Sequence, residues 1–205
     1  MNAVFNDKMI YKLMKEGVKI VDPFDEDFLQ PASIDLRLGS VRYKYLLEKY
    51  VLGEVIDEQK FAKEQFDSLV LKDGECAFVG IHERISIPNN AIGIVIPRSG
   101  ITRLGLNVIV SYMNPGYSGH MPLTIVNHTG VTVTLKPGYR VVQLILLSMF
   151  EEPTKLYKDI EDVKYYDEKV EPSRLHMDKE ISRLLDEVIE QETPSLYKLM
   201  KDASL

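Results

Sequence analysis

The stretch I-P-R-S-G-I-T-R-L-G-L-N-V-I-V-S-Y-M-N-P-G-Y-S-G-H-M-P-L-T-I-V, residues Ile96–Val126, contains two arginines, a Ser-Gly pair and an Asn-Pro-Gly turn between segments rich in β-branched residues. β-Branched residues favour strands, whereas Asn, Pro and Gly favour tight turns. The stretch therefore predicts a polar site built on a β-sheet.

An anion site is the first chemical interpretation of this stretch. Arg98 and Arg103 fall within one turn that also contains Ser99 and Gly100. Two guanidinium groups beside a hydroxyl and the exposed amides around Gly100 suit a phosphate or polyphosphate. The residues alone leave an alternative open, in which both arginines are surface residues paired with some of the 31 acidic side chains.

The segment after the turn alternates between apolar and mixed positions. One set comprises Met121, Leu123 and Ile125, and the other comprises His120, Thr124, Val126 and His128. Because successive side chains of a strand point to opposite faces, the apolar set is expected in the core. The other set should then face the pocket that the Arg98 turn borders. Nothing here has the spacing of a transition-metal site, and we expect no protein-bound metal.

Strand signals extend in both directions from this stretch. Short β-rich segments separated by turns run from Leu69 to Phe150 at a spacing of roughly ten residues, which favours an all-β barrel or sandwich over a βαβ fold. The segment Gln30–Gly39 has the alternation of a half-buried strand, with Asp35 on the polar face. Cys76 is expected to be a buried strand residue.

Helices are predicted only near the two ends. Residues Asn6–Glu16 form an amphipathic pattern, capped by Asn6 or Asp7 and ended by Gly17. After Pro153 a polar and aromatic segment, 157–174, predicts a surface arm, followed by an amphipathic helix at Asp178–Gln191 and a short helix at Pro194–Lys201. We therefore expect a β domain at 1–152 and a C-terminal region at 153–205.

Composition limits the function further. The chain has 205 residues and a net charge of −6, which argues against a protein that coats nucleic acid. With no apolar run long enough for a membrane span or a signal peptide, and with a single cysteine, we expect a cytoplasmic protein without disulfides. A small anionic molecule remains a suitable partner.

Four segments, in order, resemble the motifs of the dCTP deaminase and trimeric dUTPase superfamily. They are Q-P-A-S-I-D-L-R-L-G at Gln30–Gly39, P-R-S-G-I-T-R-L-G-L at Pro97–Leu106, N-P-G-Y-S-G-H-M-P-L-T at Asn114–Thr124 and P-G-Y-R-V-V-Q-L-I at Pro137–Ile145. The resemblance implies a distorted, jelly-roll-like β-barrel of the dUTPase type. It also implies a homotrimer with sites between subunits, and a deoxynucleoside triphosphate carrying Mg²⁺ as the ligand.

The resemblance also assigns residues to the parts of this ligand. Arg98 and Ser99 match phosphate contacts made from a neighbouring subunit, and Gly100 takes a position that is usually Ser in deaminases and Gly in dUTPases. Arg103 matches an active-site arginine of deaminases, and Tyr117 matches the aromatic ring that lies against the deoxyribose.

Two further regions carry expected ligand contacts. Gln143 matches a polar position of the closing strand. In the tail V-K-Y-Y-D-E-K-V-E-P-S-R, the residues that resemble those folding over the triphosphate are Lys164, Tyr165 and Arg174.

Two positions depart from the family's chemistry. The carboxylate that handles protons in deamination is replaced by Thr124, and the Asp that activates water in dUTPases is replaced by Asn114. Neither residue accepts a proton as a carboxylate does. We expect a protein that handles dCTP or dUTP and resembles dCTP deaminase, with a catalytically inactive homologue that binds nucleotides or has a regulatory or assembly role as the alternative. His120, His128 and Glu83 are the candidates for a replacement base.

Overall fold

This computed structural model describes residues 4–192, and the side chains of residues 4–188. The chain divides into two compact units, one formed by Met1–Lys44 with Lys63–Glu171 and the other by Tyr45–Ala62 with Pro172–Leu205. The predicted boundary between residues 152 and 153 stays a prediction.

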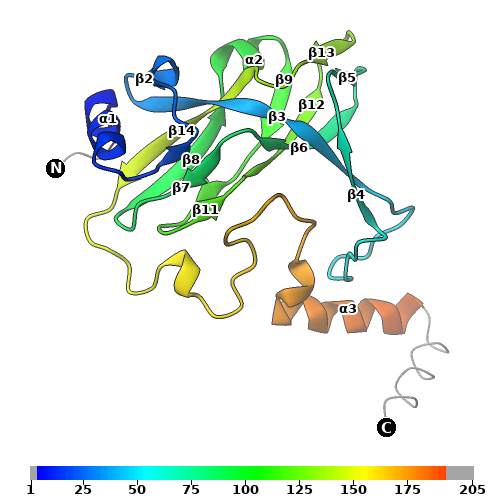
Figure 1. Cartoon of the computed structure of the whole chain (residues 1–205). Coiled ribbons are helices and arrows are strands. Elements are labelled where there is room, and N and C mark those ends of the chain that lie inside the picture. The colour runs from blue at the N-terminus through cyan, green and yellow to red at the C-terminus, as the bar shows by residue number, and fades with distance from the viewer. Residues whose placement is uncertain (1–3, 193–205) are drawn as a thin grey trace. The chain divides into compact units, whose positions relative to one another are not determined.

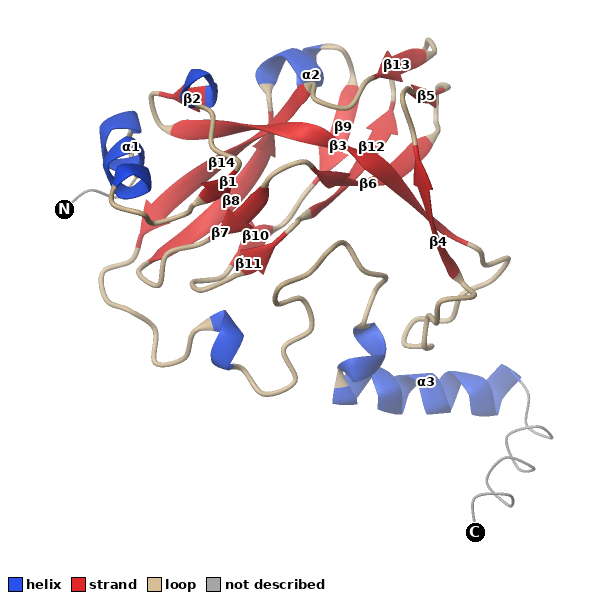
Figure 2. Ribbon diagram, viewed as in Figure 1, coloured by secondary structure: helices blue, strands red, loops and turns tan. Residues whose placement is uncertain are grey.

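Strands dominate the first unit (Figures 1 and 2). In chain order they are β1 Val21–Asp22, β2 Leu29–Gln30, β3 Ser33–Tyr45, β4 Phe61–Gln65, β5 Leu69–Leu71, β6 Cys76–Ile81, β7 Arg84–Ser86, β8 Ala91–Pro97, β9 Leu106–Ile109, β10 Tyr112–Met113, β11 Ser118–Gly119, β12 Pro122–Asn127, β13 Val133–Leu135 and β14 Arg140–Ser148. The helical elements are α1 Asp7–Lys15, η1 Glu26–Phe28, α2 Ser99–Arg103, η2 Tyr157–Asp159, η3 Leu175–Met177 and α3 Lys179–Glu192.

The long strand β3 joins the two halves of the main sheet. The strand order is β10-β8-β14-β3-β6-β12-β9, with a three-stranded sheet β1-β7-β11 and a two-stranded sheet β13-β5 beside it. The first part of β3 pairs antiparallel with β14 and its later part pairs antiparallel with β6, with an irregularity in between. Such a curled antiparallel sheet confirms the predicted mainly β fold, and it brings the ends of β8, β14 and β3 together.

Side-chain alternation places the core between these strands. On β12 the odd-numbered side chains are buried, with Leu123 at 0% and Ile125 at 1% exposure, whereas Thr124 and Val126 are half-buried. The predicted division of this segment into two faces is confirmed, because a strand turns alternate side chains to opposite sides of the sheet.

Two burial predictions are wrong. Asp35 lies on the polar face of β3, yet it is only 1% exposed, because Arg98 and Arg140 approach its carboxylate on that face. Cys76, predicted to be buried, is exposed. It pairs with Val126 at the start of β6 and so points away from the core, which takes its neighbour Ala77.

The predicted terminal helices are found where the structure describes them. Helix α1 begins after Asn6, whose side-chain oxygen accepts from the Met9 amide at 2.9 Å, and it is followed by Gly17 at φ +89°. The helix predicted at Asp178–Gln191 corresponds to α3, and the one at Pro194–Lys201 lies outside the described residues. Within residues 4–192 no helix has both the length and the apolar composition needed to cross a bilayer.

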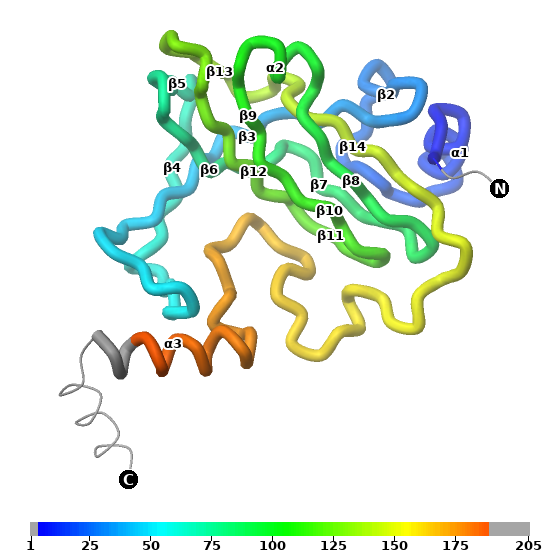
Figure 3. Tube along the Cα trace, turned by 180° about the vertical axis from the view of Figure 1, so that it is seen from behind, coloured from blue at the N-terminus to red at the C-terminus, as the bar shows by residue number. Residues whose placement is uncertain are grey.

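The segment between β14 and Glu171, hereafter the arm, packs on the turn before β11. In Figure 3 it is the yellow to orange tube that runs beside β10 and β11. The Tyr157 amide donates to the Pro115 carbonyl at 2.9 Å, and the Asp167 amide donates to the Ser118 carbonyl at 2.8 Å. Glu168 and Val170 are each 5% exposed, so the prediction of a surface arm is wrong for these two residues.

Candidate functional site

A pocket of about 530 Å³ lies where β8 ends and α2 begins. The residues that line it are Gln30, Pro31, Ala32, Ser33, Asp35, Arg98, Ser99, Gly100 and Gln143. Four of them were predicted as ligand-binding residues from the sequence: Arg98, Ser99, Gly100 and Gln143. The fold therefore brings residues of the Pro97–Leu106 motif, the Pro137–Ile145 motif and the start of β3 together around one polar cavity, hereafter the Arg98 pocket.

The strand register explains this convergence. Gln143 of β14 pairs with Asp35 of β3 on one side and with Ile96 of β8 on the other. The chain leaves β8 after Pro97, and the Arg98 amide donates to the Val141 carbonyl at 3.0 Å. Arg98, which caps the start of α2, thus lies directly beside the central strands.

The buried carboxylate of Asp35 orients Arg98. The Nε of Arg98 donates to Asp35 Oδ2 at 3.1 Å, and Arg140 Nη1 approaches the same oxygen at 3.2 Å. Arg98 Nη1 also donates to the Arg140 carbonyl at 3.4 Å. Because Nε and Nη1 are engaged in this way, the guanidinium is fixed in orientation and its Nη2 carries two more N–H donors.

Asp35 is only partly satisfied in this arrangement. Burial raises the pKa of its carboxyl group, and the positive charges of Arg98 and Arg140 oppose that shift. Its second oxygen, Oδ1, is buried and has no hydrogen-bond partner in the described structure. An unpaired buried acceptor is unfavourable, and this oxygen belongs to a residue that lines the pocket.

Sequence reasoning missed three members of this site: Asp35, Ser33 and Arg140. Ser33 is 7% exposed, and its hydroxyl lies 3.5 Å from Gln143 Oε1. The available signal was that Ser33 and Asp35 are polar residues within the Gln30–Gly39 motif, and that Arg140 precedes Gln143 in the closing motif. Alternation alone placed Asp35 towards solvent.

The remaining predicted residues lie elsewhere. Arg103 ends α2, is exposed, and does not line the Arg98 pocket. Thr124 is half-buried on β12, between Phe78 of β6 and Ile109 of β9 in the strand register. Its direct cross-strand neighbours are therefore apolar, and neither can accept a proton.

Asn114 and Tyr117 belong to the turn between β10 and β11. The Tyr117 amide donates to the Asn114 carbonyl at 3.0 Å. Tyr117 is 5% exposed and its hydroxyl donates to Glu168 Oε1 of the arm at 2.6 Å. Its ring also lies 6.0 Å from that of Tyr157, centroid to centroid. Within this single chain the turn and the Arg98 pocket are separate groups.

Two of the predicted tail residues lie in the arm and one does not. Lys164 and Tyr165 are half-buried arm residues of the first unit. Arg174 precedes η3 in the second unit. Their predicted role against a triphosphate stays a prediction.

The candidates for a replacement base have other surroundings. Glu83 is 2% exposed and engaged by Arg37, whose Nε donates to Oε1 at 2.6 Å and whose amide donates to Oε2 at 2.9 Å.

His120 lines a different cavity, of about 330 Å³, beside Tyr43 and His82. The expectation that the His120 face borders the Arg98 pocket is wrong. Burial, and then the charge of Arg84, lower the pKa of His120. His128 is exposed.

In the described part of the chain, no group of three or more His, Cys, Asp or Glu side chains is placed to hold a metal ion.

Comparison with known proteins places this geometry in a family. A family model described as dCTP deaminase-like (DCD) matches residues 4–149. A curated protein of Methanopyrus kandleri named "dCTP deaminase, dUMP-forming" is 31% identical over 189 residues, which cover 86% of this chain and 97% of that protein. A "dCTP deaminase" of Pyrococcus horikoshii is 31% identical over 147 residues, covering 72% of this chain and 85% of that protein.

The structural comparison supports the fold. The crystal structure of 2'-deoxycytidine 5'-triphosphate deaminase from Agrobacterium tumefaciens superposes with a TM-score of 0.58 at 23% identity, covering 71% of this chain. The match spans about half of that longer chain, 48%. The resemblance to dCTP deaminases stated from the sequence and the predicted mainly β fold are thereby confirmed. The chain belongs to the dCTP deaminase-like family.

Proposed function

We propose that this protein binds a pyrimidine deoxynucleoside triphosphate, dCTP or dUTP, with its phosphates in the Arg98 pocket. The observation that carries the proposal is the fixed Arg98 guanidinium beside Ser99 and Gly100 in a polar cavity. Planar guanidinium groups bind phosphate oxygens in two-point contacts, and fixing them beforehand lowers the entropic cost of binding. The family membership supports the nucleotide as the source of these phosphates.

A turnover step has weaker support than binding. Hydrolytic deamination needs a group that takes a proton from water and returns it to the base or the leaving amine. Thr124 lies between apolar cross-strand neighbours, and Asn114 has an amide in place of a carboxylate. Binding without reaction is therefore the primary proposal.

Deamination of dCTP, alone or with dUTP hydrolysis, is the second candidate function. The relatives named above carry that activity in their names. One residue favours it on chemical grounds: the lowered pKa of His120 keeps its imidazole neutral near pH 7, as a general base requires.

The assembly and the cation are part of the same proposal. The turn with Asn114 and Tyr117 does not contribute to the Arg98 pocket within one chain. A homotrimer that places the turn of one copy beside the Arg98 pocket of the next would unite them, as the resemblance implies. Since the described residues form no metal cluster, Mg²⁺ would enter bound to the triphosphate and screen its charge.

Calorimetric titration tests whether the protein binds a deoxynucleoside triphosphate. The protein is titrated with dCTP, dUTP and dTTP in the presence of Mg²⁺, and with deoxycytidine as the ligand that lacks phosphates. We expect saturable heat with a triphosphate and much weaker binding of the nucleoside. No heat and no change in melting temperature with any triphosphate would overturn the proposal.

Product analysis then tests the second candidate. Ammonia, dUMP and pyrophosphate are followed after incubation with dCTP or dUTP and Mg²⁺. Product above a protein-free control establishes turnover, and His120→Asn should then abolish it if this imidazole is the base. Binding without product establishes the primary proposal.

A further inference from the structure

The cavity that His120 lines, hereafter the His120 cavity, lies between β3, β6 and the arm and shares no lining residue with the Arg98 pocket. Its volume of about 330 Å³ is at the lower end of the range of about 300–1,000 Å³ for small-molecule sites. Its polar lining consists of Ser40, Tyr43, His82, His120 and Lys169. All of its lining residues belong to the first unit, so one compact body forms the cavity.

An irregularity in β3 forms one wall of the His120 cavity. The register of β3 against β6 shifts between Leu38 and Arg42. Gly39 and Gly80 meet at this point, where a Cβ built on Gly39 would lie 2.7 Å from the Gly80 carbonyl oxygen. Only glycine permits such a close approach of two backbones. Bulges of this kind occur often beside functional sites.

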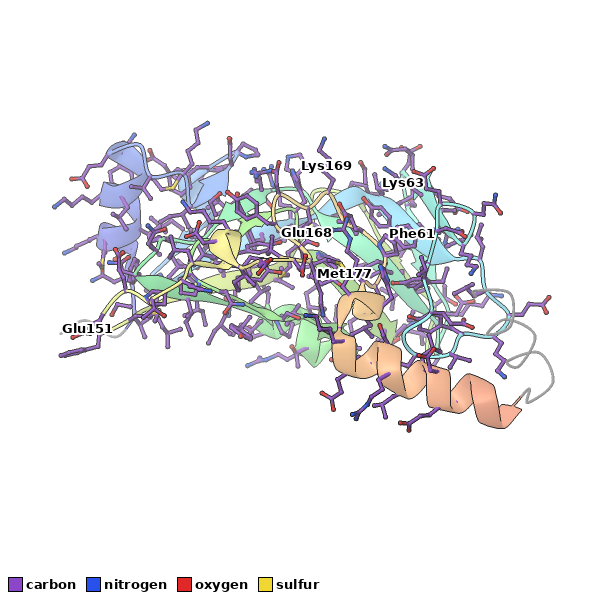
Figure 4. All side chains as sticks on the ribbon, turned by 90° about the horizontal axis from the view of Figure 1, so that it is seen from below. Phe61, Lys63, Glu151, Glu168, Lys169 and Met177 are labelled. Carbon is purple, nitrogen blue, oxygen red and sulfur yellow. The ribbon has the colours of Figure 1, made fainter. Side chains whose placement is uncertain are left out.

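The arm forms the opposite wall. The Tyr43 hydroxyl donates to the Lys169 carbonyl at 3.3 Å, and the His120 amide donates to the Glu168 carbonyl at 2.9 Å. Val170 is 5% exposed and has φ +61°, a conformation that β-branched residues rarely adopt. In Figure 4 Glu168 lies among other side chains, whereas the neighbouring Lys169 extends outwards. The backbone of the arm is therefore fixed on both sides of Lys169.

The charge of the His120 cavity is one-sided. His82, His120 and Lys169 are basic, and among the described residues that line the cavity none is acidic. Burial, and then the charges of Arg84 and His82, lower the pKa of His120, while Glu83 opposes them. The cavity is thus suited to an anion, although the protein has a net charge of −6.

The imidazole of His120 adds an acceptor to these donors. Its lowered pKa keeps the ring neutral near pH 7, and the ring is hydrogen-bonded to the Ile81 backbone. A neutral imidazole has one N–H donor and one acceptor nitrogen, and the bond to the Ile81 carbonyl uses the donor. The second ring nitrogen can therefore accept a hydrogen bond from a ligand. Inorganic phosphate at neutral pH offers both charged oxygens and a P–OH group, whereas sulfate has no hydrogen.

We propose that the His120 cavity is a second anion site, which binds inorganic phosphate between the arm and the sheet. Lys169 and the N–H of His82 contact the charged oxygens, and His120 accepts from the P–OH group. The bound ion would tie the arm to β6. This site stands apart from the proposed nucleotide function, because its residues are distinct from those of the Arg98 pocket.

The four histidines of the chain provide the readout. Their Cε1–H resonances, assigned with single His→Asn variants, are followed by NMR at pH 7 while inorganic phosphate replaces chloride at constant ionic strength. We expect saturable shifts of His82 and His120 with one common dissociation constant. His128 and His176, which do not line the cavity, should not respond. Arg98→Lys should leave these shifts unchanged, and their loss in this variant would assign them to the Arg98 pocket and overturn the proposal.

Substitution of Lys169 tests the contribution of the arm. Lys169→Ala should weaken phosphate binding about tenfold, as expected for loss of a hydrogen bond to a charged group. Lys158→Ala is the matched control, because it removes an exposed lysine of the arm that does not line the cavity. Its phosphate affinity should equal that of the wild type. If both variants weaken binding equally, the arm acts only through its overall charge and the proposed site is wrong.

Other anions test the acceptor role of His120. Sulfate and methyl phosphate, which at pH 7 lack the hydrogen or have largely lost it, should bind roughly fivefold more weakly than inorganic phosphate, as for one lost hydrogen bond. Tighter binding of methyl phosphate would assign the cavity to phosphate esters, and equal binding of sulfate would remove the selectivity; either result overturns the assignment to inorganic phosphate. The absence of any phosphate-dependent shift of His82 and His120 overturns the site itself. Triphosphate binding at the Arg98 pocket is measured separately by its own titration with dCTP.

Discussion

Replacement of Arg98 by lysine should weaken triphosphate binding although it preserves the charge. In the structure, Arg98 uses Nε for Asp35 and Nη1 for the Arg140 carbonyl, which leaves Nη2 for a ligand. A lysine presents its donors from one nitrogen, which cannot contact Asp35 and a phosphate with the geometry of a guanidinium fork. The lysine ammonium should pair with the buried carboxylate and give up the phosphate.

The size of this effect follows from the hydrogen bond between Nη2 and a phosphate oxygen. A hydrogen bond to a charged group contributes about 1.5–3 kcal/mol, so its removal corresponds to a roughly 10- to 100-fold weaker dCTP affinity. Since Arg98→Lys still neutralises Asp35, the free energy of unfolding should change by less than about 1.5 kcal/mol. Arg98→Ala should lose at least as much affinity and be less stable, because Asp35 then keeps only Arg140.

Calorimetry with dCTP and Mg²⁺, combined with urea denaturation, measures both quantities. Arg42→Lys is the matched control, since Arg42 pairs with Glu64 and does not line the pocket. Its dCTP affinity should equal that of the wild type. If Arg98→Lys binds dCTP within about twofold of the wild type, the orientation of Arg98 by Asp35 does not contribute to binding and the reasoning is refuted.

Three further substitutions test other parts of the structure. Burial raises the pKa of Asp35 above its ordinary 3.8, so the folded state binds this proton more tightly than the unfolded chain. The contribution of Asp35 to stability should therefore fall as the pH rises from the unfolded to the folded pKa, and Asp35→Asn should flatten that part of a urea-denaturation series between about pH 3 and 7. Equal slopes would contradict this. Thr124→Glu introduces a carboxylate where the resemblance to deaminases predicts one and should raise ammonia release from dCTP, whereas Thr124→Gln should not; no gain would show that position 124 alone does not determine turnover. Asn127 is 0% exposed and donates to the Leu71 carbonyl at 2.9 Å, so Asn127→Ala should lower the unfolding free energy by about 2–4 kcal/mol. Exposed Asn107 is its control in the same denaturation assay, and an equal loss in Asn107→Ala would refute the role of burial.

Local patterns predicted the strands well because a strand side chain has only two directions. The alternation of Met121, Leu123 and Ile125 fixed which face of β12 is buried, and the structure confirms it. The same rule failed for Asp35. Alternation tells which residues share a face, but it does not tell whether other segments cover that face.

The candidate site shows the same limit of local patterns, here for residues that are far apart in the sequence. Arg98, Ser99, Gly100 and Gln143 were predicted as ligand-binding residues, and the structure places them around one cavity. The tertiary fold added the start of β3, whose chain lies far from Arg98 in sequence. No local pattern could show that two arginines share one oxygen of Asp35, because that contact depends on the register of β14 and β3.

The arm is the clearest case of a feature that only the tertiary structure decided. Its polar composition predicted a surface segment, yet Glu168 is buried against Tyr117. By itself, the sequence determined the mainly β fold and the family, since these depend on local periodicity and on the order of motifs. The pairing of Arg98 with Asp35 and of Tyr117 with Glu168 depends on long-range contacts, whose partners are chosen by packing and burial of the whole domain.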